Sequence, residues 1–255
     1  MNKIKLISSL TEFQNYRHQL KASTTVGFVP TMGALHQGHA SLIKNSSQNN
    51  ELTVVSIFVN PTQFNNSTDL EKYPRTLEAD LKLAKDSGAH IVLAPHFEEM
   101  YPDQYRYKIT ENEFSKKLCG AHRPGHFDGV LTVVMKLLQI VKPKIAYFGE
   151  KDYQQLLLIQ QMAQAFFLDL EIKSCETIRE ADGLAMSSRN VRLTPEGRKI
   201  APAIFQALKN YKNFSDSQSE LKKLNIELEY LEEHFQRRFI AAYIDGVRLI
   251  DNVAI

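Results

Sequence analysis

The fold is decided by VPTMGALHQGH, residues Val29–His39. In front of it, an apolar, β-branched run at Thr25–Val29 predicts a buried strand, and behind it residues 40–49 predict a helix. His36 and His39 therefore lie at a strand-to-helix junction, where unpaired N–H groups and the helix dipole favour anions. Two imidazoles at this spacing can donate hydrogen bonds to a polyphosphate as its charge develops. The alternative interpretation is an ordinary turn that carries two surface histidines.

Short apolar runs alternate with longer amphipathic segments over most of the chain. The expected strands are Thr25–Val29, Leu52–Val59, His90–Leu93, Ile145–Phe148 and Leu170–Ser174, and the expected helices are Ala40–Ser47, Leu77–Ser87, Val130–Val141 and Tyr153–Phe167. Such alternation predicts an α/β fold, in which a parallel sheet carries helices on both faces.

The pattern changes after Asn190. Thr194 and Pro195 predict a helix start, with threonine as the N-cap and proline at the first helical position. A polar helical region is expected over Ser215–Glu233. Two strands, Phe239–Ile244 and Val247–Asp251, then flank Asp245-Gly246, which is typical of a hairpin turn. We therefore expect two domains, residues 1–181 and residues 182–255, of which the second is a small α+β domain.

Composition and charge narrow the function classes. Of 255 residues, 43% are hydrophobic and 24% charged, as in an ordinary globular protein, and a net charge of +2 gives no reason to expect nucleic acid or a membrane as partner. No apolar run approaches the ~20 residues of a membrane span, and Met1–Lys5 lacks the apolar core of a signal peptide. Cys119 and Cys175, the two cysteines, predict reduced thiols. We expect a cytoplasmic protein.

Polar side chains follow two of the expected strands. Asn60 and Gln63 come after Leu52–Val59, at the edge of a parallel sheet where ligands bind. Lys151 and Asp152 follow Ile145–Phe148 in the same way, and are suited to phosphate oxygens and to a ribose hydroxyl. The alternatives are an ordinary Asn-Pro turn in the first case and a solvated, charged first helical turn in the second.

Two further groups of polar residues bear on the prediction. The loop Met186–Asn190 places small hydroxyls beside Arg189 and resembles a phosphate-closing lid, although serine-rich loops are usually plain linkers. Asp69, Glu78 and Asp80 could approach Mg²⁺, but charge on a helix surface is the interpretation we prefer for them.

Taken together, these segments resemble one family, the pantothenate synthetases, which are ATP-dependent pantoate–β-alanine ligases. The matching segments are Pro30–His39, Phe58–Phe64, Tyr73–Asp80, Arg123–Phe127, Phe148–Gln155, Asp182–Asn190 and Arg248–Asn252. They occur in the family's order and cover most of the chain.

The resemblance implies a Rossmann-like parallel sheet with helices on both faces, related to the nucleotidylyltransferases and class I aminoacyl-tRNA synthetases, plus a small α+β C-terminal domain. That second domain looks shorter than is usual for the family. The implied reaction has two steps: ATP adenylates the carboxylate of (R)-pantoate and pyrophosphate leaves, then the amine of β-alanine attacks the pantoyl adenylate and releases AMP. Mg²⁺ with ATP and a cytoplasmic homodimer are also implied, without nucleic acid or membrane partners.

The resemblance also implies roles for individual residues, carried over by matching position. His36, His39, Lys151 and Arg189 are the expected catalytic residues, with His39 as the general acid. The expected ATP-binding residues are Met32, Gly33, His36, His39, Gly149, Lys151, Asp152, Ile178, Met186, Ser187, Ser188 and Arg189. Pantoate and β-alanine are expected to contact Met32, Asn60, Gln63 and Gln155. No metal ligand is assigned.

Two rival interpretations remain open. One is a superfamily member that transfers adenylyl groups to another acceptor; against it, Gln63 and Gln155 suit an acceptor without phosphate, because phosphates favour arginine. The other is a non-catalytic nucleotide sensor or RNA-binding relative. That interpretation predicts a damaged histidine pair or a damaged Ser187–Arg189 loop, and both are intact.

Overall fold

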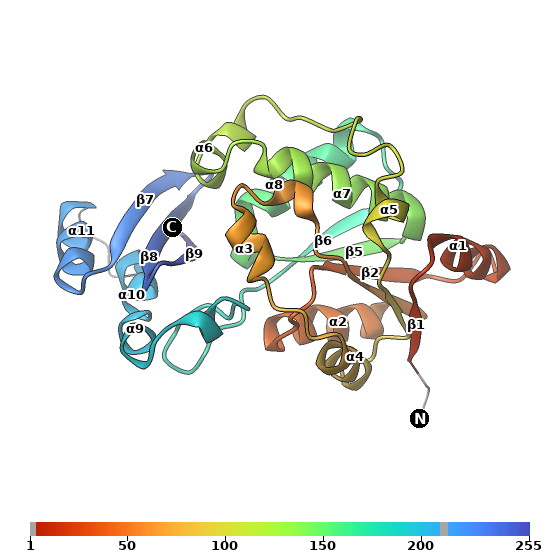
Figure 1. The fold of residues 1–255 in the computed structure, drawn as a ribbon, viewed down its shortest axis with the longest axis horizontal. Coiled ribbons are helices and arrows are strands. Elements are labelled where there is room, and N and C mark those ends of the chain that lie inside the picture. The colour runs from red at the N-terminus through yellow and green to blue at the C-terminus, as the bar shows by residue number, and fades with distance from the viewer. Residues whose placement is uncertain (1–3, 210–213) are drawn as a thin grey trace. The chain divides into compact units, whose positions relative to one another are not determined.

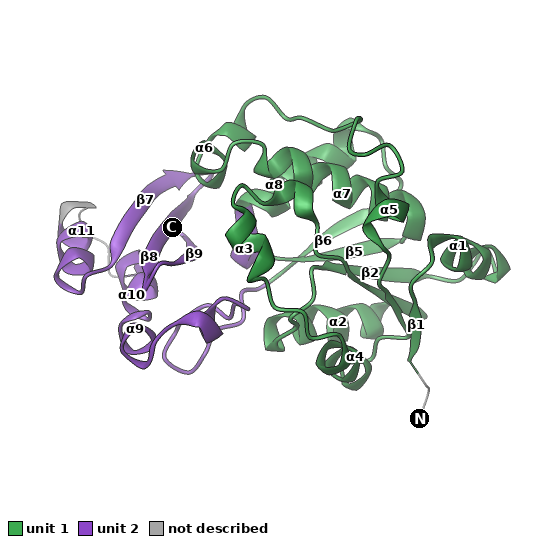
Figure 2. Ribbon diagram, viewed as in Figure 1, with its two compact units in different colours: residues 1–149, 154–175 green, residues 150–153, 176–255 purple. Residues whose placement is uncertain are grey.

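The computed structural model describes residues 4–209 and 214–255, so Met1–Lys3 of the N-terminal run considered above lie outside the described residues. The chain forms two compact units (Figure 2). One unit, called here the sheet unit, comprises Met1–Gly149 and Gln154–Cys175. The other, called the C-terminal unit, comprises Glu150–Tyr153 and Glu176–Ile255.

The sheet unit is built on six parallel strands in the order β1-β4-β3-β2-β5-β6. Their bounds are β1 Lys5–Ile7, β2 Val26–Thr31, β3 Leu52–Ile57, β4 Ile91–Leu93, β5 Ile145–Gly149 and β6 Glu171–Cys175. The five expected strands of this region are all present, which confirms the α/β prediction. A sixth strand, β1, is not among the predicted ones; it pairs with β4 at the edge of the sheet.

Helices cover both faces of this sheet (Figure 1). They are α1 Leu10–Gln19, α2 Gln37–Asn49, α3 Ser67–Glu71, α4 Leu77–Asp86, α5 Phe97–Met100, α6 Cys119–His122, α7 His126–Val141 and α8 Tyr153–Ala165, with 3-10 turns η1 Pro61–Gln63 and η2 Phe114–Lys116. Helices α2 and α4 lie on one face and α7 and α8 on the other, as right-handed crossovers require when the chain first extends the sheet one way and later the other.

The apolar core under α2 and α4 explains why these segments fold as they do. Val29 of β2 and Val55 of β3 are paired in register, and both are fully buried against Ile43 of α2 and Ala84 of α4. Because side chains alternate along a strand, the neighbouring Phe28, also fully buried, points to the opposite face. Both faces of the central strands are thus apolar, as a parallel sheet requires.

The order of the strands marks where a ligand is expected. β2 lies between β3 and β5, and the connections that leave β2 and β5 extend the sheet in opposite directions. At such a switch point the loops that follow the two strands diverge and leave a binding region at their carboxyl ends. The turn Met32–His36 follows β2, and Gly149 is the last residue of β5.

The C-terminal unit is a three-stranded antiparallel sheet with small helices. Its elements are η3 Glu150–Asp152, η4 Asn190–Arg192, α9 Pro195–Ile200, α10 Ala203–Lys209, α11 Phe214–Lys223, β7 Glu227–His234, β8 Arg237–Ile244 and β9 Val247–Ala254. The hairpin predicted at Asp245-Gly246 is confirmed, since it joins β8 to β9. A buried apolar cluster that includes Ile204, Leu208 and Ile240 packs the helices on the sheet.

One expectation for this unit is wrong. The polar segment Ser215–Glu233 was expected to be helical throughout, but α11 ends at Lys223 and β7 begins at Glu227. Pairing of β7 with β8 buries Tyr230 and Leu231, which follow a register shift between Leu228 and Tyr230. Burial in a sheet therefore overrides the helix propensity of a glutamate-rich stretch.

Within residues 4–209 and 214–255, no helix has the length and apolar character that crossing a membrane requires.

Candidate active site

The turn between β2 and α2 holds the histidine pair in one geometry. His36 is the N-cap of α2, and its Nδ1 accepts a hydrogen bond from the Gly38 N–H at 3.1 Å. In return, the Nδ1 of His39 accepts a hydrogen bond from the His36 N–H at 3.2 Å. This reciprocal capping box satisfies two N–H groups of the first helical turn. The ring centroids are 4.2 Å apart with a tilt of 48°.

The capping box also decides where each ring carries its proton. A ring nitrogen that accepts a hydrogen bond from a backbone N–H is unprotonated, so a neutral ring keeps its proton on Nε2. Both Nδ1 atoms accept in this way. The turn therefore presents His36 and His39 as a pair of Nε2–H donors at the positive end of a helix, which suits the binding of an anion.

Two glycines are required by this turn. A Cβ on Gly38 would lie 2.8 Å from Cε1 of His36, so only glycine lets the ring lie over the first turn of α2. Gly33 has φ of +83°, in the left-handed region, and a Cβ there would lie 3.0 Å from Oδ2 of Asp80.

Asp80 holds the same turn from α4. Its carboxylate accepts hydrogen bonds from the Ala34 N–H (Oδ2, 3.0 Å), the Leu35 N–H (Oδ1, 2.7 Å) and the Thr76 hydroxyl (Oδ1, 3.1 Å). Asp80 is 2% exposed, so the expectation that it lies on a helix surface is wrong. The sequence does not reveal this role, because the two N–H groups from which Asp80 accepts lie more than forty residues earlier in the chain.

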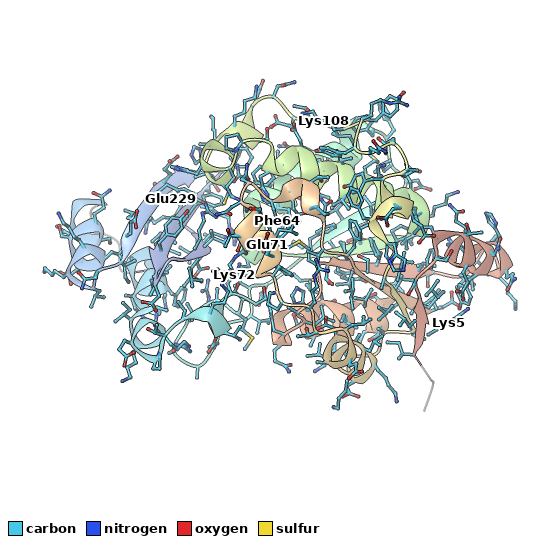
Figure 3. All side chains as sticks on the ribbon, viewed as in Figure 1. Lys5, Phe64, Glu71, Lys72, Lys108 and Glu229 are labelled. Carbon is cyan, nitrogen blue, oxygen red and sulfur yellow. The ribbon has the colours of Figure 1, made fainter. Side chains whose placement is uncertain are left out.

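A second polar group follows β3 at the turn η1, which ends just before Phe64 (labelled in Figure 3). Nδ2 of Asn60 donates to Oε1 of Gln63 at 3.1 Å and to the Gly129 carbonyl at 3.1 Å. Because Gln63 accepts with its oxygen there, its amide nitrogen faces away from Asn60 and lies 3.1 Å from Sδ of Met32. Met32 belongs to the histidine-bearing turn, so the structure brings Met32, Asn60 and Gln63 together.

The Asn60 side chain is fully used inside the protein. Its Oδ1 accepts from the Tyr101 hydroxyl at 2.9 Å and from the Thr62 hydroxyl at 3.0 Å, and the residue is 1% exposed. Burial raises the pKa of Tyr101 to about 12, so this hydroxyl stays protonated and donates. Asn60 therefore orients Gln63, and its amide has no hydrogen-bonding capacity left for a ligand.

The backbone of Gln63 is fixed from the start of α7. Its carbonyl lies 2.8 Å from Nδ1 of His126 and accepts from Nη2 of Arg123 at 3.3 Å. A Cβ on Gly129 would lie 2.5 Å from the Thr62 carbonyl oxygen, so glycine permits this close approach of α7 to η1. The Gln63 amide is thus held by contacts to both its backbone and its side chain.

Two adjacent glutamines of α8 have different surroundings. Gln154 is 4% exposed and bonds to the Phe114 and Lys117 carbonyls (both 2.8 Å) and to the Cys119 N–H. Gln155, the residue predicted to bind substrate, is half-buried, and its amide has no hydrogen-bond partner within the described part of the chain.

In the C-terminal unit, the predicted nucleotide-binding residues lie in two places, the loop region of residues 178–189 and the turn η3. The Met186 N–H donates to the Ile178 carbonyl at 3.0 Å, which places these two backbones side by side. Oγ of Ser187 accepts from the Arg189 N–H at 3.2 Å and holds Ser187–Arg189 in a compact turn. Lys151 and Asp152 lie in η3, with 3.8 Å between Nζ and Oδ2.

Metal-ion binding and a pocket in the C-terminal unit both bear on the predicted site residues. Among the described residues, no group of three His, Cys, Asp or Glu is arranged to hold a metal ion. A pocket of about 630 Å³, lined in part by Phe205, Lys209 and Arg238, contains none of the predicted site residues, all of which the structure describes.

The comparisons with known proteins agree on one family. The family model for pantoate-beta-alanine ligase matches residues 5–254. A pantothenate synthetase of Bdellovibrio bacteriovorus is 57% identical over 98% of this chain and 99% of its own length. One from Legionella pneumophila (strain Lens) is 52% identical with the same coverage.

A solved structure adds the ligands of a relative. The pantoate-beta-alanine ligase of Francisella tularensis, complexed with β-γ ATP and β-alanine, superposes with a TM-score of 0.95. It is 41% identical and covers 99% of this chain and 98% of its own. A pantothenate synthetase from Thermus thermophilus has a TM-score of 0.89 at 37% identity.

Proposed function

The chain belongs to the pantoate-beta-alanine ligase family and is an enzyme that condenses pantoate with β-alanine, and we propose that it does so through a pantoyl adenylate. The observation that carries this mechanism is the capping box, which holds His36 and His39 as Nε2–H donors at a helix N-terminus. The same turn contributes Met32, which contacts the Gln63 amide.

In the first step, a carboxylate oxygen of pantoate attacks the α-phosphorus of ATP. A new P–O bond forms, the bond to the β-phosphate oxygen breaks, and pyrophosphate leaves with the electron pair. Charge builds up on the leaving group, so donors fixed beforehand lower the barrier. We assign this work to the Nε2–H groups of His36 and His39, with His39 as the general acid.

The remaining ATP contacts are assigned by matching position. Lys151, Ser187, Ser188 and Arg189 bind the β- and γ-phosphates, because cations and hydroxyls offset their charge. Asp152 and the backbone of Gly149 contact the ribose. The backbones of Ile178 and Met186 contact adenine, which their pairing supports. Gly33 lets the backbone approach the nucleotide closely.

Pantoate is bound by two amides. The side-chain oxygen of Gln63 accepts a hydrogen bond from Asn60. The N–H₂ group of Gln63 therefore donates to the ligand, and it selects a ligand oxygen that can accept a hydrogen bond. Gln155 contributes a second amide, and Met32 supplies an apolar wall. Uncharged donors of this kind suit a hydroxy acid better than a phosphorylated substrate.

In the second step, the amine of β-alanine attacks the carbonyl carbon of the pantoyl adenylate. A C–N bond forms, the C–O bond to AMP breaks, and the nitrogen loses a proton. The mixed anhydride is already activated, so this step needs orientation and exclusion of water more than a strong base.

Mg²⁺, a homodimer and a cytoplasmic location complete the proposal. Mg²⁺ usually binds through substrate phosphates and few protein groups, which fits a described chain without an acidic cluster; it would neutralise phosphate charge. The buried thiols of Cys119 and Cys175, which form no disulfide, suit a reducing compartment. Sedimentation of the purified protein tests the dimer.

The reaction is tested with ATP, Mg²⁺ and (R)-pantoate, with and without β-alanine. We expect pyrophosphate exchange that needs pantoate alone, and AMP with pantothenate only when both substrates are present. Formation of ADP and phosphate in place of AMP would exclude the adenylate mechanism. Condensation without pantoate-dependent exchange would argue against a reversible first step.

A further inference from the structure

The segment Glu150–Tyr153 leaves the end of β5 but is held in the C-terminal unit. It forms η3 and opens α8, and it contains Lys151 and Asp152, to which the proposed function assigns phosphate and ribose contacts. Its position is therefore set by residues that lie far away in the sequence.

Asn252 of β9 makes the central contacts to this segment. Its Nδ2 donates to the Glu150 carbonyl at 2.8 Å and to the Lys151 carbonyl at 2.9 Å. Its Oδ1 accepts from Nε of Arg237 at 3.0 Å, and the residue is 3% exposed. Both N–H bonds of the amide are thus directed at two consecutive carbonyls, while a neighbouring guanidinium holds its oxygen.

Arg237 reinforces the same arrangement. Its Nη2 lies 2.9 Å from Oε2 of Glu150, and its guanidinium carbon lies 4.0 Å from the centre of the Tyr153 ring. The planar group therefore bonds to the first residue of the segment, stacks on the last one, and orients Asn252.

The residue before Asn252 holds the other nucleotide segment of this unit. Asp251 is 4% exposed and pairs with Arg179 through two bonds, of 2.6 and 3.0 Å. Arg179 directly follows Ile178, the predicted adenine contact. Two consecutive residues of β9 thus connect to two segments of the C-terminal unit that are proposed to bind ATP.

We propose that Asn252 is a positioning residue for ATP, which sets the backbone of Glu150 and Lys151 so that Lys151 meets the phosphates. This inference rests on the proposed function for the identity of the ligand. Asn252 touches no reacting atom in it, and its effect is transmitted through two carbonyl hydrogen bonds. Without these two hydrogen bonds the segment populates several conformations. Only the fraction of molecules in the competent conformation binds ATP, so the apparent affinity for ATP falls.

The test is Asn252→Asp, which keeps the size of the side chain and the acceptor for Arg237. It replaces the donating N–H₂ with an oxygen that faces two carbonyl oxygens. We expect the KM for ATP to rise about tenfold or more, because both hydrogen bonds are lost and repulsion takes their place. The KM values for pantoate and β-alanine should stay within about twofold, since neither substrate is bound by this segment.

The matched control is Glu229→Gln in the same small sheet (Glu229 is labelled in Figure 3). Glu229 of β7 pairs with Arg248 of β9 at 3.0 Å, so the substitution weakens this sheet through a different pair. We expect a lower Tm with an unchanged KM for ATP. An equal rise of that KM in both variants would show that Asn252 acts only through the stability of the sheet.

A second readout does not depend on catalysis. Backbone amide exchange of residues 150–153 should speed up in Asn252→Asp and stay unchanged in Glu229→Gln. If Asn252→Asp fails to fold, Asn252→Ala gives the same test without the repulsion. A folded variant at Asn252 with a wild-type KM for ATP and wild-type exchange overturns the proposal. If the proposed function itself is wrong, the wild-type protein will not condense pantoate with β-alanine, a result that differs from every outcome above.

Discussion

The turn after β2 and the segment after β5 both follow a parallel strand and open a helix, yet different parts of the chain hold them. The first is held within the sheet unit, by its own histidines and by Asp80. The second is held by Asn252, which lies 102 positions beyond Glu150. Two loops in equivalent positions are therefore held differently: the first by contacts within the sheet unit alone, the second by a strand of the C-terminal unit.

Among substitutions that separate the two loops, Asp80→Ala should have the largest effect, which is on the free energy of unfolding. The substitution leaves the N–H groups of Ala34 and Leu35 without their acceptor in a buried position, so we expect a loss of about 3 kcal/mol in the free energy of unfolding. Urea denaturation measures it. Asp86→Ala, on the exposed side of the same helix, is the control and should be neutral. Equal stability of the two variants would mean that the first turn is not held by Asp80.

His39→Ala should have the next largest effect, on turnover. Losing one of two donors fixed at the helix N-terminus should lower kcat about 10²-fold while the fold is kept. His39→Gln separates the chemistry from the cap, because a glutamine at this helix position can still accept from the His36 N–H. It should recover stability without recovering turnover. Near-normal turnover in folded His39→Ala would remove His39 from the mechanism.

A smaller effect is expected from Tyr101→Phe. The variant loses the donor to Oδ1 of Asn60, which keeps its bond from Thr62, so Gln63 is held less firmly. We expect the KM for pantoate to rise about threefold and stability to fall by about 1 kcal/mol. Tyr107→Phe removes a hydroxyl from an exposed ring and is the control. An unchanged KM for pantoate would limit Tyr101 to a packing role.

The smallest effect concerns a surface carboxylate of the C-terminal unit. The Arg198 guanidinium, with help from the Leu184 N–H, holds the pKa of Asp182 below its usual range. A lowered pKa stabilises the fold at neutral pH and ceases to do so as the pH falls through the folded-state value. The stability gap between wild type and Arg198→Gln should therefore be under about 1 kcal/mol at neutral pH, because Asp182 is partly exposed, and should shrink as the pH falls below the ordinary aspartate pKa of about 3.9. A gap that widens in acid would contradict this assignment.

The first turn could be predicted from sequence because its determinants are local. An apolar strand, two glycines and two histidines at capping positions all lie within Thr25–His39. Hydrophobic periodicity likewise located four further strands of the sheet unit, β3, β4, β5 and β6, and the helices α2, α4, α7 and α8. The individual roles of the site residues rest on the family resemblance and stay predictions.

What sequence could not supply are contacts between distant segments. Asp80 and its partners are separated by a strand and two helices, and the periodicity of α4 does not reveal that a polar position faces another loop. Asn252 presents the same difficulty, since an amide in a strand gives no sign of which carbonyls it will meet. β7 was missed for a related reason: its pairing with β8 decides its structure, and its composition favours a helix.

If the histidines serve both as helix caps and as donors to ATP, as we propose, few substitutions at these positions are compatible with both functions. Serine or aspartate at position 36 would cap α2 without supplying a ring N–H donor, and lysine would donate but could not accept from the Gly38 N–H. On the proposed mechanism, a substitution at His36 that keeps one of the two functions therefore loses the other. Few stabilising substitutions are therefore compatible with this turn, and mutations that raise the thermal stability of the protein are expected elsewhere in the chain.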